Sequence, residues 1–363
     1  MHTILIRYIT KSFFKSFLAV FFCFYVIVTI LDMMDVVRQY YSAGYNPSIP
    51  FIIKVTLCRA LLNMTSFFSF IVLLSAIVFF IVMNSRLEIT IIKSIGTSTK
   101  KLLQYMFISV AILSVLYITV FDAMSVYSFR YLKLANISMK YDSQSSENLT
   151  ITNKGIWFRD KYEDVSYIIS ARGFNKSGTS LFNVRIFTFD KYGDLNKTVI
   201  AKSVNISNGQ WKAADSKEIT NDGETYTHEE YQLPTHLSYK RLQRMVTNPQ
   251  SISFWQIRKY MAILDKVGLS SVQYQMHWFS RISVILQMFA FVAMVTAFCI
   301  NYNPRDNKTY IRKIACLLIG AFPIHFINNV ILAYGTSGKI PISLAATILP
   351  AFVLCIGLVG MED

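Results

Sequence analysis

The sequence lacks the short motifs by which many enzymes are recognised. It contains no GxxxxGK[ST] loop to cradle the phosphates of a nucleotide, so we do not expect the chain to hydrolyse ATP by that route. Its five histidines form no HExxH pattern and no other paired spacing typical of a metal site. No cluster of catalytic side chains stands out. We therefore predict that the chain is not an enzyme and has no catalytic residue, no metal site and no cofactor.

Cysteine is scarce, and the middle of the chain has none. The five cysteines all lie in or beside apolar runs, and none forms a CxxC pair. The segment 140–250 must therefore fold without disulfides. We expect the cysteines to act as small apolar packing residues. They are Cys23, Cys58, Cys299, Cys316 and Cys355.

Long apolar runs are what the sequence has in abundance. Of its 363 residues, 53% are hydrophobic and 15% aromatic, well above the usual composition of a soluble chain. Six runs are long enough to cross a hydrocarbon core of about 30 Å, which takes roughly 20 helical residues. The first run is too long for a removable signal peptide, and we expect it to be retained. We predict an integral membrane protein with spans at 13–34, 60–85, 102–121, 282–304, 314–338 and 340–361.

Basic residues in the short connections predict the orientation. With six spans both termini share one side, where eleven basic residues flank the spans, against four on the other side. Cytoplasmic loops carry the excess of Lys and Arg, so we expect the termini and the segment 85–100 in the cytoplasm. The eleven are Arg7, Lys11, Lys15, Arg86, Lys93, Lys100, Lys101, Arg305, Lys308, Arg312 and Lys313, and the four are Arg38, Lys54, Arg59 and Lys339.

The formal net charge of +15 does not indicate a nucleic-acid partner. Residues 141–250 hold 14 basic and 13 acidic side chains, so nearly all of the excess lies in the spans and their flanks. That distribution suits anionic lipid headgroups. We expect no nucleic acid to bind.

Residues 140–250 read as an inserted all-β domain on the far side of the membrane. Segments rich in β-branched and aromatic residues alternate with turn signals, which fits a sandwich, a jelly roll or an open barrel. We expect Trp157 and Trp211 to anchor its core. Residues 251–270 predict a linking helix with Ile257, Met261 and Leu264 on one face. The predicted organisation is thus three spans in 1–139, the β domain in 140–250, the linking helix in 251–270 and three spans in 271–363.

The connector between the second and third spans, SRLEITIIKSIGTSTK, has an apolar face of its own. Leu87, Ile91 and Ile95 recur every four residues, which predicts a short helix at about 85–95. Gly96 is well placed to end it. From the residues alone, this face could lie on a protein partner or on the lipid surface.

Charged side chains near the ends of the first and third spans are the candidate ligand contacts. Asp35 and Arg38 follow the first run, and Arg130 and Lys133 follow the third. An ionisable group in a membrane is costly enough to suggest function, although a solvated rim would also hold such residues. We predict that these four contact an anionic amphiphile.

Several stretches together resemble the LptF/LptG (YjgP/YjgQ) family of lipopolysaccharide export permeases. The resemblance follows the whole chain in order, and its most specific part is the connector. The end of the first span and the C-terminal pattern are more similar to LptG than to LptF. The stretches are IRYITKSFFKSF, LDMMDVVRQ, NSRLEITIIKSIGTSTKKL, GIWFRD, SISFWQIRKYMAILDKVGL and GKIPISLAATILPAFVL.

The resemblance implies a non-catalytic permease subunit of an ABC transporter in the bacterial inner membrane. In this family, an LptF–LptG heterodimer and two LptB ATPase subunits extract lipopolysaccharide and pass it to a periplasmic β-jelly-roll domain, then to LptC and its jelly-roll relatives. The connector would be the coupling helix that docks in a groove of the ATPase. Leu87, Ile91 and Ile95 would fill that groove, and Glu88, beside Arg86, would pair with a basic residue of the ATPase.

One position departs from the family pattern. Relatives of LptG commonly have a lysine shortly before the acidic residue matched to Asp35, where this chain has Asp32. A carboxylate there would repel lipid phosphates. We therefore expect either a less phosphorylated lipid or contacts redistributed to Arg38, Arg130 and Lys133.

Two other functions fit parts of the sequence. The chain could be an envelope scaffold whose β domain binds a partner without a transport cycle, or a membrane enzyme acting on lipids. A docking helix that bears Glu88 favours the transporter over the scaffold. The lack of a catalytic cluster counts against the enzyme.

Overall fold

The computed structural model divides the chain into two compact units. The first comprises Met1–Tyr141, Gln250–Phe254 and Gln275–Asp363, and the second comprises Asp142–Pro249 and Trp255–Tyr274. The structure describes residues 2–42, 44, 46–139, 149–152, 155–162, 165–175, 179–190, 194–206, 211–221, 223–233, 246–300 and 307–360.

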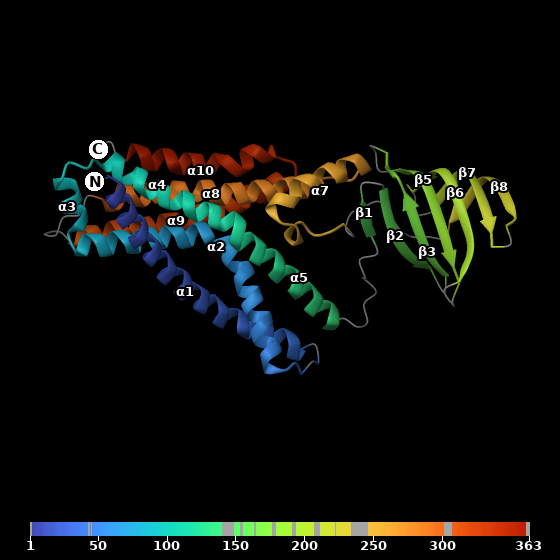
Figure 1. The fold of residues 1–363 in the computed structure, drawn as a ribbon, viewed down its shortest axis with the longest axis horizontal. Helices are drawn as coiled ribbons and strands as arrows, with labels where there is room; N and C mark the ends of the chain where they lie inside the picture. The colour runs from blue at the N-terminus through green and yellow to red at the C-terminus, as the bar shows by residue number, and fades with distance from the viewer. Residues whose placement is uncertain are drawn as a thin grey trace. The chain divides into compact units, whose positions relative to one another are not determined.

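Six helices of the described chain are long and apolar enough to cross a membrane, as the sequence predicted. The start of α1, the end of α10 and the short helix α3 (Glu88–Ser94) lie at one end of this unit (Figure 1). The spans are α1 (His2–Ser42), α2 (Ile49–Ser85), the continuous helix α4–η1–α5, α8 (Val272–Cys299), α9 (Asn307–Thr336) and α10 (Ile342–Val359).

Two of the spans form the centre of the helical unit. In the apolar stretches of α2 and α8, 61% of residues are buried, against 11% in α1 and 22% in α9. Large side chains such as Phe68, Phe79 and Phe291 fill the space between the helices. The outer faces of α1, α9 and α10 stay apolar and exposed, which suits contact with lipid or with another membrane protein.

The third span continues past the end of its apolar run. It consists of α4 (Thr99–Leu116), a π-helical turn η1 (Tyr117–Phe121) and α5 (Asp122–Met139). Such π turns are rare and often occur at functional sites. This one directly precedes Asp122, the first charged residue after the apolar run, which is buried in the helical unit.

The second unit contains an eight-stranded antiparallel sheet. Its strands follow the chain in the order β1-β2-β3-β5-β6-β7-β8, and the short β4 (Gly173–Phe174) pairs with β5. The inserted all-β domain is therefore confirmed. The main strands are β1 (Leu149–Thr152), β2 (Gly155–Tyr162), β3 (Val165–Ala171), β5 (Ser180–Phe189), β6 (Leu195–Asn205), β7 (Trp211–Thr220) and β8 (Thr225–Leu233).

The sheet curls around an apolar interior. Phe158 on β2 and Trp211 on β7 are both buried, and their ring centroids lie 5.5 Å apart although three strands separate them in the sheet. Trp157 points to the opposite face, where it is 42% exposed and stacks on Phe187. The prediction of a core anchor was right for Trp211 and wrong for Trp157, because successive strand residues face opposite sides.

The segment predicted as a linking helix contains α7 (Phe254–Val267), in which Ile257 and Leu264 are fully buried and Met261 is partly buried. The helix ends at Gly268, whose φ of +77° is the left-handed conformation that favours glycine. A Cβ at Gly268 would lie 2.6 Å from the carbonyl oxygen of Phe174, so the end of α7 lies against the backbone of β4.

Candidate functional site

The helix α3 follows α2 almost without a break. Arg86 and Leu87 form a turn, and Leu87 has a φ of 58°, an uncommon conformation for a residue other than glycine. Gly96 adopts positive φ after the helix, and Ser98 then caps α4 by accepting a hydrogen bond from the amide of Lys101. Where the sequence placed a helix at about 85–95, the structure has α3 at Glu88–Ser94.

Two different faces of α3 are apolar. Ile89 and Ile92 are buried and belong to the core of the helical unit. Leu87, Ile91 and Ile95 are 46%, 55% and 57% exposed, and we call these three residues the α3 stripe. Because the inner face already anchors the helix, the α3 stripe is left as a surface that the described residues do not cover.

Glu88 stands at the start of α3, beside the stripe. The hydroxyl of Tyr8 on α1 donates a hydrogen bond of 2.8 Å to its Oε2 atom. A guanidinium nitrogen of Arg86 lies 3.9 Å from its Oε1 atom. The carboxylate is thus held by α1 while keeping acceptor capacity for another partner.

The inner side of α3 binds the end of α8. The Nζ atom of Lys93 donates to the carbonyl of Ile300 at 3.3 Å. The side-chain amide of Asn84, near the end of α2, donates to the carbonyl of Cys299 at 3.0 Å and to the hydroxyl of Tyr310 at 2.9 Å. Desolvation by the surrounding protein lowers the pKa of Lys93.

At the end of the helical unit away from α3, Asp32 is turned toward α2. It is 8% exposed and accepts a hydrogen bond of 2.8 Å from the side-chain amide of Asn63. The Nε atom of Arg59 lies 3.9 Å from its other oxygen. Since Asn63 and Arg59 compensate the carboxylate within the protein, its presence does not require a lipid with fewer phosphates.

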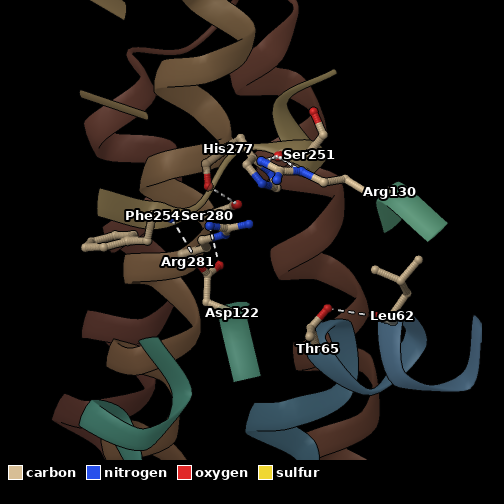
Figure 2. A network of polar contacts seen from close by, with 9 residues as sticks. All are labelled: Leu62, Thr65, Asp122, Arg130, Ser251, Phe254, His277, Ser280 and Arg281. Carbon is tan, nitrogen blue, oxygen red and sulfur yellow. Dashed lines mark hydrogen bonds and ion pairs between the residues drawn. The ribbon is translucent and has the colours of Figure 1, made fainter. Parts of the chain in front are cut away.

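The four predicted lipid contacts differ in their surroundings. Asp35 and Arg38 lie exposed on α1. Arg130 on α5 donates from Nε and Nη2 to the carbonyl of Ser251, at 3.1 and 2.9 Å, so much of its guanidinium serves to hold that segment (Figure 2). Lys133, one turn further along α5, is partly exposed.

A buried ion pair joins α5 to α8. Asp122 and Arg281 form this pair, and they are only 5% and 8% exposed (Figure 2). The other oxygen of Asp122 accepts a hydrogen bond of 2.9 Å from the backbone amide of Phe254. The Phe254 ring stacks on Trp278 of α8, with the centroids 5.6 Å apart. A buried charge requires such a partner, so this contact fixes α5, α8 and residues 250–254 together.

A comparison with protein-family models identifies the family of this chain. The model for the lipopolysaccharide export system permeases LptF/LptG matches residues 7–362. The chain belongs to this family. No curated protein matches it in a sequence search. It is therefore a multi-pass, non-catalytic membrane subunit of the lipopolysaccharide export transporter, which extracts lipopolysaccharide with energy from its ATPase partner, LptB.

Sequence reasoning identified Glu88 in this permease but missed its partner Tyr8, and it did not predict the pair of Asp122 and Arg281. Tyr8 lies between the basic residues Arg7 and Lys11 at the start of α1, and Arg281 stands directly before an apolar run. Their charge or polarity near a span was the available signal, but the pairing with Glu88 and Asp122 depends on tertiary contacts. Among the described residues, no group of three or more His, Cys, Asp or Glu side chains could hold a metal ion.

Proposed function

We propose that this permease is the LptG-type subunit of a heterodimer with a paralogous LptF-like six-span permease. The heterodimer would lie in the bacterial inner membrane with α3 and both termini in the cytoplasm. The excess of basic residues around α3 and the termini supports this orientation. The exposed apolar faces of α1, α9 and α10 support the pairing.

The α3 stripe is the observation that carries the proposal. In this arrangement α3 docks in a groove of the LptB-like ATPase, which takes up Leu87, Ile91 and Ile95. Glu88, with Arg86 beside it, pairs with a basic residue at the rim of the groove. The α3 stripe consists of three apolar side chains that are about half exposed, and the carboxylate of Glu88 lies next to it. This combination suits a groove on a protein better than a lipid surface, because the carboxylate can form a charged contact with a protein.

The lipid is proposed to enter beside the far ends of α1 and α5. Asp35, Arg38, Arg130 and Lys133 would meet its phosphates and sugars there, with the basic members binding phosphate. The lipid would then pass to the curled sheet, whose apolar interior can receive acyl chains at about 0.8 kcal/mol per CH₂ group. An LptC-like jelly-roll protein would take it onward.

A matched pair of variants on α3 tests the docking. Ile91→Ser and Thr90→Ser each leave a serine on an exposed position of α3, but only the first removes a residue of the α3 stripe. Burying one such side chain contributes about 1.5–3 kcal/mol, so we expect Ile91→Ser to weaken ATPase association roughly ten- to a hundredfold. Thr90→Ser should change it little. Glu88→Arg should also weaken association while membrane insertion stays intact.

The readout is affinity purification of the full chain in mild detergent, with co-purifying proteins identified by mass. Recovery of an ATPase subunit and a second six-span permease with the wild type supports the heterodimer. Recovery of neither, where a control complex survives, would favour the scaffold function. Equal ATPase recovery with all variants would remove the α3 stripe from the interface.

A further inference from the structure

The end of α8 has its free carbonyls bound by side chains of α2 and α3. The last carbonyls of any helix lack partners within the helix. Here the carbonyl of Cys299 accepts from Asn84 and that of Ile300 accepts from Lys93. The negative end of the helix dipole favours a cation at this place, and Lys93 is the basic residue in the last turn of α3.

Apolar packing also joins α3 to the end of α8, where Asn84 and Lys93 bind the carbonyls. Ile89 and Ile92 of α3 belong to the same buried cluster as Cys299 and Ile300. The α3 stripe faces away from this cluster and stays exposed. A partner that moves the stripe therefore moves a helix whose inner side is bonded to the end of α8.

The helix α8 lacks the residues at which helices usually kink. It contains neither proline nor glycine, whereas α9 contains Pro323 and α10 contains Pro350. Kinks occur mainly at such residues, so α8 has the sequence of a straight rod. Arg281 lies 18 positions before Cys299, which corresponds to about 27 Å along the helix.

At Arg281, α8 is linked through Asp122 to residues 250–254, the segment that follows the β domain in the chain. Arg281 pairs with Asp122, and the same carboxylate accepts from the amide of Phe254. The ring of Phe254 also stacks on Trp278 of α8. A shift of α8 along or about its axis therefore acts directly on residues 250–254 and on the start of α5.

We propose that α8 is the element that carries a displacement of α3 to the Asp122–Arg281 contact and residues 250–254, and that Lys93 is the positioning residue at its α3 end. The proposal rests on the proposed function, in which the ATPase displaces α3. It adds a route by which nucleotide-driven movement reaches the far end of the helical unit and residues 250–254, which follow the β domain in the chain.

The test compares Lys93→Met, which keeps the length of the side chain but removes the donor, with Lys93→Arg, which keeps a cationic donor. Lys101→Met is the matched control, because Lys101 is an exposed lysine in the first turn of α4. Each full-length variant is reconstituted with its ATPase and partner permease in nanodiscs containing lipopolysaccharide. Four quantities are measured: ATPase association, ATP hydrolysis, lipid released per ATP, and the nucleotide-dependent distance between spin labels at positions 286 on α8 and 124 on α5.

We expect Lys93→Met to keep ATPase association and hydrolysis but to lower lipid released per ATP by about threefold to thirtyfold. The nucleotide-dependent change in label distance should shrink in parallel, and Lys93→Arg should restore both. Wild-type lipid release per ATP in Lys93→Met would overturn the proposal. Loss of ATPase association in that variant would also overturn it, because Lys93 would then be a docking residue. A wild-type chain that binds no ATPase would instead refute the proposed function.

Discussion

Tyr8 and Glu88 are joined by a hydrogen bond of 2.8 Å across 80 positions of the chain. The bond ties the first turns of α1 to the first residue of α3. It orients the carboxylate that we propose to contact the ATPase, and it makes α1 sensitive to the position of α3.

Removing the Tyr8 hydroxyl should weaken ATPase binding without abolishing it. In Tyr8→Phe the Glu88 side chain loses a hydrogen bond that contributes about 0.5–1.5 kcal/mol. Binding of the ATPase must then order the Glu88 side chain, which lowers the affinity. We expect a two- to tenfold rise in the Kd for the ATPase, measured by titration into permease-containing nanodiscs. Tyr41→Phe, at an exposed position near the other end of α1, serves as the control. Unchanged or tighter binding by Tyr8→Phe would show that Tyr8 does not orient Glu88.

Breaking the ion pair between α5 and α8 should be costly. Asp122→Asn leaves the buried guanidinium of Arg281 without a counter-charge, which we expect to lower the free energy of unfolding by about 3–5 kcal/mol. The double variant Asp122→Leu/Arg281→Leu removes both charges and should recover much of that loss. Thermal unfolding of the detergent-solubilised chain measures both. A single variant as stable as the wild type would contradict the role of this pair.

The β domain carries a pH-dependent contact between β6, β7 and β8. Glu218 lies 3.0 Å from Lys197 and 3.1 Å from His228. Burial acts to raise the pKa of Glu218, but hydrogen bonds and charge from Lys197 and His228 outweigh it and lower the pKa below the ordinary 4.5. The contact therefore stabilises the domain above that pH, and the stabilisation is lost as the pH falls through the lowered pKa.

Glu218→Gln should remove this acid sensitivity. Hydrogen exchange of β6 and β7 in the full chain, compared with the wild type at each pH, should show weaker protection in the variant near neutral pH and no difference at the most acidic pH. Asp215→Asn removes the partner of Lys202 in a pair that is mostly solvent-exposed, and it should change little. The same difference between Glu218→Gln and wild type at every pH would contradict the prediction.

The two faces of β2 should differ in their access to lipid. Phe158 faces the curled interior and Trp157 faces outward, so the two neighbouring positions form a matched pair. With a photoreactive phenylalanine at position 158, we expect crosslinks to lipopolysaccharide that depend on ATP. The same group at position 157 should give few. Equal crosslinking at both positions would argue against an interior route.

The membrane spans could be predicted from the sequence because the hydrocarbon core imposes a length and a composition on each one. The α3 stripe was visible for a similar reason, since its four-residue spacing is a local property of a helix. The role of Asp32 was not visible. Its neutralisation depends on Asn63 and Arg59, which approach it only when α1 and α2 pack side by side.

Other contacts stayed hidden because both partners are ordinary residues when considered singly. Asp122 reads as the end of a span and Arg281 as the start of another, and their pairing requires the packed bundle. Trp157 was misplaced because its neighbour Phe158 takes the interior position. Alternation along a strand identifies two faces, but it does not say which of them the curled sheet will enclose.

The π turn before Asp122 contains one residue more than an α-helical turn would. For this reason η1 can arise from a straight α-helix by a single-residue insertion. Losing that residue again would rotate α5 relative to α4 by about 100°. Asp122 would then turn away from Arg281, and Arg130 away from Ser251. Deleting one codon in this stretch would thus change the direction in which every side chain on α5 points. The number of residues in η1 is therefore a stronger constraint than the identity of its apolar residues.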